Sequence, residues 1–237
     1  MNEQAEKFLK DFTMLESWLR QQTSSDNYVT FTNLVDIGSG MNNVIRAHRD
    51  YLKSLGNLRN AIVHGRSFPI TILATPELSV IEEFGIICDE IYQPKTVYEI
   101  AAKQIVPLSL ENHLHEALIA MRTHDYSQVI VQLTNGDYGI ITREGITKWI
   151  EANLAEDIVS LQDVTLEDVF AHEDVNAWDY ISRKKSVYDA ATIFGQTDRR
   201  IQALLVSENG RKNDKPLGVI TFWDISQYFG SKPYPIL

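Results

Sequence analysis

Three side chains with complementary chemistry, Arg59, Asn60 and His64, lie close together in the first third of the chain. Asn60 and His64 stand four positions apart, which places them on one face of a helix, and the long side chain of Arg59 can reach that face. Histidine titrates near neutral pH and moves protons to and from oxygens, while arginine stabilises charge on a phosphate. Asparagine can orient either partner. The trio is therefore suited to metal-independent cleavage of RNA.

Two other interpretations of this segment stay open. Arg59 and His64 can cap the C-terminus of a helix, where cations are favoured and Gly65 supplies the turn that follows. The segment can equally form a non-catalytic surface for dimerisation or nucleotide binding. Residues 43–66 also contain a basic stripe with a single acid, Asp50, which a solvated helix face would explain. The cations of this basic stripe are Arg46, Arg49, Lys53, Arg59 and Arg66.

A second candidate site lies near the C-terminus. Thr221 ends a β-rich run, and Asp224 falls in the first turn of the helix expected to follow. Backbone donors and a hydroxyl at a helix N-terminus favour an anion, and a carboxylate can accept two hydrogen bonds from a diol. The same spacing also fits a capping box that holds no ligand. Lys184 and Lys185, with Arg183, either neutralise phosphates or form an exposed basic turn.

Helices are expected to position the first cluster. Apolar residues recur at helical spacing over residues 5–22, 31–64 and 77–92. The glycines of Gly38-Ser39-Gly40 and Gly56 are expected to interrupt or bend the middle segment. The sequence therefore predicts an all-α bundle over residues 1–94, ending at a proline.

Helices alternate with strands after residue 94. Short β-rich runs flank polar turns at residues 135–137 and 207–215, a pattern that predicts hairpins. An internal repeat is visible, because the acid–Ala pair Glu116-Ala117 recurs as Asp189-Ala190 and the segment 139–142 recurs as 218–221. One copy cannot cover both faces of its own sheet, so two copies are expected to pack face to face around a pseudo-two-fold axis.

These patterns predict an α+β protein with two domains. The first is the all-α helical bundle of residues 1–94, and the second covers residues 95–237. The first repeat lies at about 95–155 and the second at about 160–230.

Composition and charge narrow the possible binding partners and cellular locations of the protein. A net charge of −10 argues against a surface that binds nucleic acid over its whole extent. No apolar run is long enough to cross a membrane, and the N-terminus lacks the pattern of a secretory signal. The lone cysteine, Cys88, cannot form an internal disulfide, so a cytoplasmic location is expected. No cluster has the spacing of metal ligands, and no metal is expected.

The segment Gly218-Val219-Ile220-Thr221-Phe222-Trp223-Asp224 resembles the Gly-h-h-Thr-x-x-Asp motif of cystathionine-β-synthase (CBS) domains, which occur in tandem as a Bateman module. The resemblance covers about Thr96 to Gly230 and implies two βαββα-type repeats with clefts for adenosyl ligands such as AMP, ADP, ATP or S-adenosylmethionine. It implies that the motif threonine contacts phosphate or ribose and that the aspartate contacts the ribose hydroxyls. The first copy has Gly145 where the aspartate belongs, which favours a single occupied site. The ligand-binding residues are then Gly218, Thr221, Asp224 and Thr142, with Lys184 and Lys185.

The string from Arg59 to His64 resembles the Arg-polar-x-x-x-His motif of HEPN domains, helical modules of which many are metal-independent endoribonucleases. The resemblance covers about residues 1–95 and is best from Leu58 to Gly65. It implies an active site formed where two copies meet, and therefore a homodimer.

Two hypotheses of different classes follow. In the first, an adenosyl ligand in the C-terminal module switches cleavage of single-stranded RNA by the helical half, through coupling between separate sites. In the second, the protein is a non-enzymatic nucleotide sensor or adaptor whose helical half only dimerises or binds a partner. The acidic balance favours the second hypothesis and the basic stripe favours the first. Neither requires a bound cofactor for chemistry.

Overall fold

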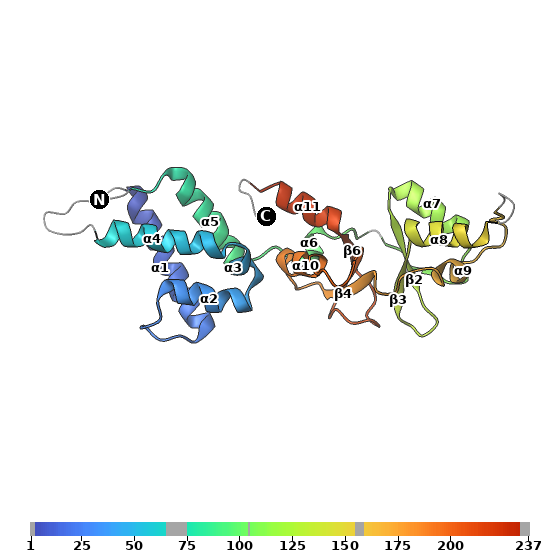
Figure 1. Ribbon diagram of the computed structural model, residues 1–237, viewed down its shortest axis with the longest axis horizontal. Coiled ribbons are helices and arrows are strands. Elements are labelled where there is room, and N and C mark those ends of the chain that lie inside the picture. The colour runs from blue at the N-terminus through green and yellow to red at the C-terminus, as the bar shows by residue number, and fades with distance from the viewer. Residues whose placement is uncertain (1–2, 65–74, 104, 155–158, 233–237) are drawn as a thin grey trace. The chain divides into compact units, whose positions relative to one another are not determined.

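The computed structural model describes residues 3–64, 75–103, 105–154 and 159–232 (Figure 1). These residues group into two compact units. The helical unit holds the described residues up to Lys95 together with those from Phe229, and the repeat unit holds Thr96–Tyr228.

The described part of the helical unit is built from helices that bury an aromatic core. Phe8, Phe12 and Phe84 are almost completely buried, and the ring of Phe12 also lies 4.3 Å from that of Phe31, centroid to centroid. Burial of these large apolar side chains is the main favourable term for packing the helices together. The helices are α1 (Glu3–Thr23), α2 (Phe31–Met41), α3 (Asn43–Ala47), α4 (Arg49–His64) and α5 (Leu78–Tyr92).

The long helical pattern of residues 31–64 is divided at Asn42 and His48, and the predicted interruption at the glycines is wrong because they lie inside α2 and α4. Asn42 has extended backbone, and its side chain accepts hydrogen bonds from Val44 N and Ile45 N, which caps α3. Gly56 lies inside α4, where an added Cβ would stand 3.0 Å from the ring of Phe31. Glycine there permits close helix packing instead of ending a helix.

The repeat unit contains the same βαββα order twice, each preceded by a short helix. In each sheet the first strand is parallel to the second, and the second is antiparallel to the third. The first copy comprises α6 (Val97–Ile100), β1 (Leu108–Ser109), α7 (Leu114–His124), β2 (Gln128–Gln132), β3 (Tyr138–Thr142) and α8 (Arg143–Asn153). The second comprises α9 (Leu166–Phe170), β4 (Trp178–Ser182), α10 (Val187–Phe194), β5 (Ala203–Ser207), β6 (Gly218–Thr221) and α11 (Phe222–Gly230). The predicted mixture of helices and sheets is confirmed.

The two sheets of this unit share one apolar layer. Ile130 and Ile140 from the first sheet pack in one cluster with Trp178, Leu205 and Val219 from the second. Residues at alternating positions of β2 and β3, including Val129 and Ile141, pack in a separate cluster with the first copy's helices. Successive side chains of a strand point to opposite faces, so the first sheet is covered by helices on one side and by the second sheet on the other.

The repeated acid–Ala pair has a structural role in both copies. Glu116 closes a capping box with His113, and Asp189 closes one with Ser186. The alanine that follows each acid is completely buried. The repeat in the sequence therefore marks the start of a helix that packs against its sheet.

The short helix of each copy crosses to the other copy. Thr96, which precedes α6, forms an isolated β-bridge with Ser186 of the second copy. Thr165, which precedes α9, forms the equivalent bridge with His113 of the first copy. The segment that begins the first predicted repeat thus lies against the second sheet.

Candidate functional site

The second motif joins the end of β6 to the start of α11 through Asp224. One carboxylate oxygen, Oδ2, accepts hydrogen bonds from the Thr221 amide at 2.7 Å and from the Thr221 hydroxyl at 2.8 Å. In the described part of the chain, Oδ1 accepts no hydrogen bond. Phe222 and Trp223, which precede Asp224 in the chain, are 61% and 69% exposed. The capping interaction is present, and it leaves one carboxylate oxygen without a hydrogen bond from the described residues.

The first motif uses a carboxylate that lies outside the motif. The Thr142 amide donates to Glu173 Oε1 at 2.6 Å, and the Thr142 hydroxyl lies 3.1 Å and 3.0 Å from Oε1 and Oε2. Glu173 belongs to the segment between α9 and β4. A Cβ added to Gly145 would lie only 1.9 Å from Glu173 Oε1, so the carboxylate fills the space of a side chain at position 145. Burial raises the pKa of Glu173, while the hydrogen bonds from Thr142 act in the opposite direction.

The motif glycines allow close packing between segments. A Cβ at Gly218 would lie 2.9 Å from Ala101 Cβ and 3.0 Å from the carbonyl oxygen of Ala102. A Cβ at Gly139, the equivalent position, would lie 2.8 Å from the ring of Phe170. The structure therefore places Gly218 against the segment after α6, and its predicted contact with a ligand stays a prediction.

Lys184 and Lys185 lie on the exposed turn between β4 and α10. Arg183, next to them, has its guanidinium carbon 4.2 Å from the centroid of the Tyr98 ring and forms an ion pair with Glu208. Lys103 Nζ lies 4.5 Å from the same ring centroid, on the segment that crosses from the first copy. Two cations therefore lie over the ring of Tyr98, and no pattern in the sequence predicts this grouping.

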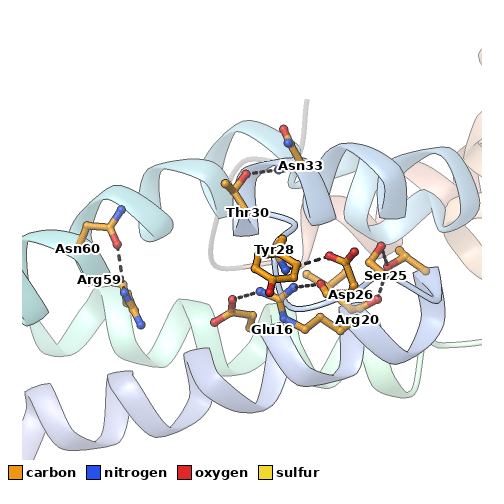
Figure 2. Close-up of polar contacts among 11 residues, drawn as sticks. Glu16, Arg20, Ser25, Asp26, Tyr28, Thr30, Asn33, Arg59 and Asn60 are labelled. Carbon is orange, nitrogen blue, oxygen red and sulfur yellow. Dashed lines mark hydrogen bonds and ion pairs between the residues drawn. The ribbon is translucent and has the colours of Figure 1, made fainter.

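The helical unit brings Arg59 and Asn60 together. Arg59 Nη1 donates to Asn60 Oδ1 at 3.2 Å (Figure 2). The guanidinium lies 6.0 Å from the Phe12 ring centroid. Both side chains line a cavity of about 230 Å³. Glu16 lines the same cavity and forms an ion pair with Arg20 at 2.6 Å. His64 is the last residue of α4, and its side chain lies outside the described residues.

Most of the described basic stripe is engaged within the helical unit. Arg49 and Lys53, on α4, form ion pairs with Asp36 of α2 at 2.5 Å and 2.7 Å. These cations hold the pKa of the Asp36 carboxyl below its usual value. Arg46 Nε donates to the carbonyl oxygen of Ser39, while Arg66 lies outside the described residues. These contacts give much of the stripe a structural role between helices.

The described residues contain no group of three or more His, Cys, Asp or Glu side chains that could hold a metal ion. None of the helices within those ranges is both long enough and apolar enough to cross a membrane. Cys88 is buried in the helical unit, and burial raises the pKa of its thiol to about 12.

Comparison with known proteins gives one family match, which lies within the repeat unit. Residues 97–152 match the family model described as CBS domain. A CBS domain pair crystallised with 5-methylthioadenosine and S-adenosyl-L-methionine is 20% identical, with 58% of this chain and 97% of that chain covered and a TM-score of 0.44.

Two further solved structures are similar to the chain. One is a CBS domain-containing protein from Kribbella flavida, 18% identical over 58% of this chain and 99% of that chain, with a TM-score of 0.44. The other is a hexameric CBS-CP12 protein from bloom-forming cyanobacteria, 20% identical over 60% of this chain and 77% of that chain, with a TM-score of 0.45. No curated protein matches the chain. Residues 97–152 of this chain thus carry a CBS domain match.

Proposed function

We propose that this protein is a regulatory sensor of an adenosyl ligand, which binds at the second motif through Thr221 and Asp224. The carboxylate of Asp224 carries the proposal. Its Oδ2 holds the Thr221 donors, its Oδ1 accepts no hydrogen bond from the described residues, and the two residues before it in the chain, Phe222 and Trp223, are exposed. A carboxylate oxygen suits the hydroxyls of a ribose, and an exposed aromatic ring suits a base.

Further residues complete the proposed site by their chemistry. Lys184 and Lys185 are exposed on their turn, where they can attract the phosphates of AMP, ADP or ATP. The CBS match of residues 97–152 supports a ligand-binding role for the repeat unit. The first motif lacks the aspartate, so Thr142 is the weaker candidate.

Calorimetric titration of the full chain with AMP, ATP and S-adenosylmethionine tests the proposal. Asp224→Asn keeps an oxygen that can cap α11 but removes the charge, and Asp224→Ala removes both. Asp198→Ala, an exposed acid of the same type on another loop, is the matched control. We expect binding in the wild type and the control, and its loss or strong weakening in both Asp224 variants. No heat with any of the three compounds would remove the sensor proposal.

We further propose that the helical unit is the output of the sensor and that its activity is metal-independent cleavage of single-stranded RNA by a homodimer. The hydrogen bond between Arg59 and Asn60 (Figure 2) supports this, because it orients the guanidinium of a residue that lines a cavity. Arg59 would stabilise phosphate charge and His64 would transfer protons. The test incubates labelled single-stranded RNA in EDTA with wild type, Arg59→Lys and His64→Ala, with and without each adenosyl compound.

A non-enzymatic adaptor is the second candidate for the helical unit. The ion pairs that Asp36 forms with Arg49 and Lys53 favour it, because they withdraw cations from contact with a phosphate backbone. Intact RNA under every condition would support the adaptor, and cleavage that His64→Ala abolishes would exclude it. Sedimentation of the full chain tests the homodimer that the nuclease proposal requires.

A further inference from the structure

We propose that Glu173 is a built-in occupant of the first motif: its carboxylate replaces the missing motif aspartate at Thr142 and limits the repeat unit to one external ligand. The identity of that ligand rests on the proposed function. The occupancy of the motif rests on the geometry around Thr142 alone.

The two motif threonines make the same hydrogen bonds to acids of different origin. Thr221 gives its amide and hydroxyl to Asp224, three residues further along the chain. Thr142 gives the same two donors to Glu173, 31 residues further along. Asp224 uses one carboxylate oxygen, whereas both oxygens of Glu173 lie within hydrogen-bond distance of Thr142. The first motif therefore has its acid fully engaged with the protein.

Space at the motif explains why the acid comes from elsewhere. A Cβ at Gly145 would lie 1.9 Å from Glu173 Oε1 and 2.2 Å from its carboxyl carbon. These distances are far below van der Waals contact, so a side chain at 145 and the carboxylate of Glu173 exclude each other. In the first motif, Gly145 and Glu173 together take the place that Asp224 has in the second motif.

The spacing between the two N-caps on either side of Glu173 is longer than the equivalent spacing in the first copy. The N-cap of α10, Ser186, follows the N-cap of α9, Thr165, by 21 positions, whereas His113 follows Thr96 by 17. The bridge between Thr165 and His113 fixes α9 beside the first copy. Glu173 follows α9 by three residues, so the position of α9 beside the first copy brings it to Thr142, the N-cap of α8.

A ligand-free measurement tests the occupancy. Hydrogen exchange of the Thr142 amide is compared in wild type, Glu173→Ala and Glu167→Ala, where Glu167 is an exposed acid on α9. Loss of a hydrogen bond to a charged acceptor predicts exchange about tenfold faster, or more, in Glu173→Ala. The Glu167→Ala control is expected to exchange like the wild type. An unchanged Thr142 amide in a folded Glu173→Ala variant would overturn the proposal.

A complementation experiment tests the exchange of acids. Gly145→Asp alone is expected to destabilise the protein, because the new side chain overlaps Glu173. Gly145→Asp combined with Glu173→Ala is expected to restore both stability and slow exchange at Thr142, since the acid then lies where the second motif has it. If the stability losses of Gly145→Asp and Glu173→Ala simply add in the double variant, the proposal is contradicted.

Ligand stoichiometry provides the functional readout. Calorimetry with AMP and S-adenosylmethionine is expected to give one site per chain in the wild type and two in the double variant. A folded double variant that still binds one ligand per chain would refute the limit on occupancy. If no compound binds to either protein, the proposed function fails, and the Thr142 exchange results alone decide whether Glu173 fills the motif.

Discussion

The two copies of the repeat solve one local problem in two ways. Each ends its last strand at a threonine whose amide and hydroxyl need a carboxylate partner. The second copy takes that carboxylate from its own helix, through Asp224, and the first takes it from a distant segment, through Glu173. The comparison teaches that a motif position can be lost from the sequence and still be filled in space.

The difference also separates structural from ligand-binding roles. A carboxylate that only satisfies the backbone can come from any direction, so Glu173 is a sufficient replacement for that purpose. A carboxylate that must also hold a ligand needs an oxygen left over, and Oδ1 of the half-buried Asp224 accepts no hydrogen bond from the described residues. On this account, the second motif is the binding site because of its uncommitted oxygen.

The substitution with the largest expected effect on stability removes Trp178 from the apolar layer between the two copies. This side chain is 7% exposed and packs against Phe170, with ring centroids 5.9 Å apart. We expect Trp178→Ala to lower the free energy of unfolding by about 3–5 kcal/mol, because it leaves a large cavity. Ile105 joins the same cluster but is only partly buried, so Ile105→Ala is expected to cost less. Urea denaturation measures the free energy of unfolding of both variants. Equal losses in the two variants would contradict the expected order.

A smaller effect distinguishes the motif glycines. Gly218→Ala brings a methyl group against the carbonyl oxygen of Ala102, which is backbone and cannot move freely. Overpacking of this kind costs about 1–3 kcal/mol. Gly139→Ala meets side-chain rings of Phe170 and Trp178, which can shift, and its cost is expected to be lower. Thermal unfolding of the two variants measures the order, and a greater loss for Gly139→Ala would reverse the interpretation.

The smallest expected effect is on the pH dependence of stability at Asp168, an acid that caps a helix as Asp224 does but is not proposed to bind a ligand. Asp168 accepts from the Thr165 amide and hydroxyl with one oxygen, as Asp224 does from Thr221. These hydrogen bonds lower the pKa of Asp168. Because its folded-state pKa lies below the unfolded value of 3.8, the stability it contributes is present above that pH and is lost as pH falls through the folded value.

Asp168→Asn is therefore expected to flatten the acid limb of the stability curve, measured by denaturation between about pH 5 and pH 2. It is also expected to leave affinity for AMP unchanged, since Asp168 only caps α9. An unchanged acid limb, or a loss of ligand affinity in this variant, would remove the distinction from Asp224.

Local patterns predict most of the secondary structure. Short continuous apolar runs mark β2 and β3, and they are continuous because successive side chains of each strand enter the helix-facing and the sheet-facing cluster in turn. The breaks between α2, α3 and α4 could not be placed, because glycine signals flexibility equally well at a bend and at a close helix contact. Gly56 proved to be a contact with Phe31, and the cap at Asn42 supplied the break.

The candidate sites show where sequence reasoning ends. Thr221 and Asp224 are three residues apart and Arg59 and Asn60 are adjacent, so their contacts are local and the sequence predicts them. Glu173 lies 31 residues from Thr142, and only the fold brings them together. The longer spacing from Thr165 to Ser186 is the one signal in the sequence, but the repeat must be aligned through its N-caps before that insertion becomes visible.

The most direct test of the central claim is the ligand stoichiometry of the full chain, measured by calorimetry with AMP and S-adenosylmethionine on wild type and Asp224→Asn. The account predicts one site per wild-type chain, and that site is lost or strongly weakened when Asp224 loses its charge. Two sites per wild-type chain, or one site that Asp224→Asn leaves intact, would contradict it.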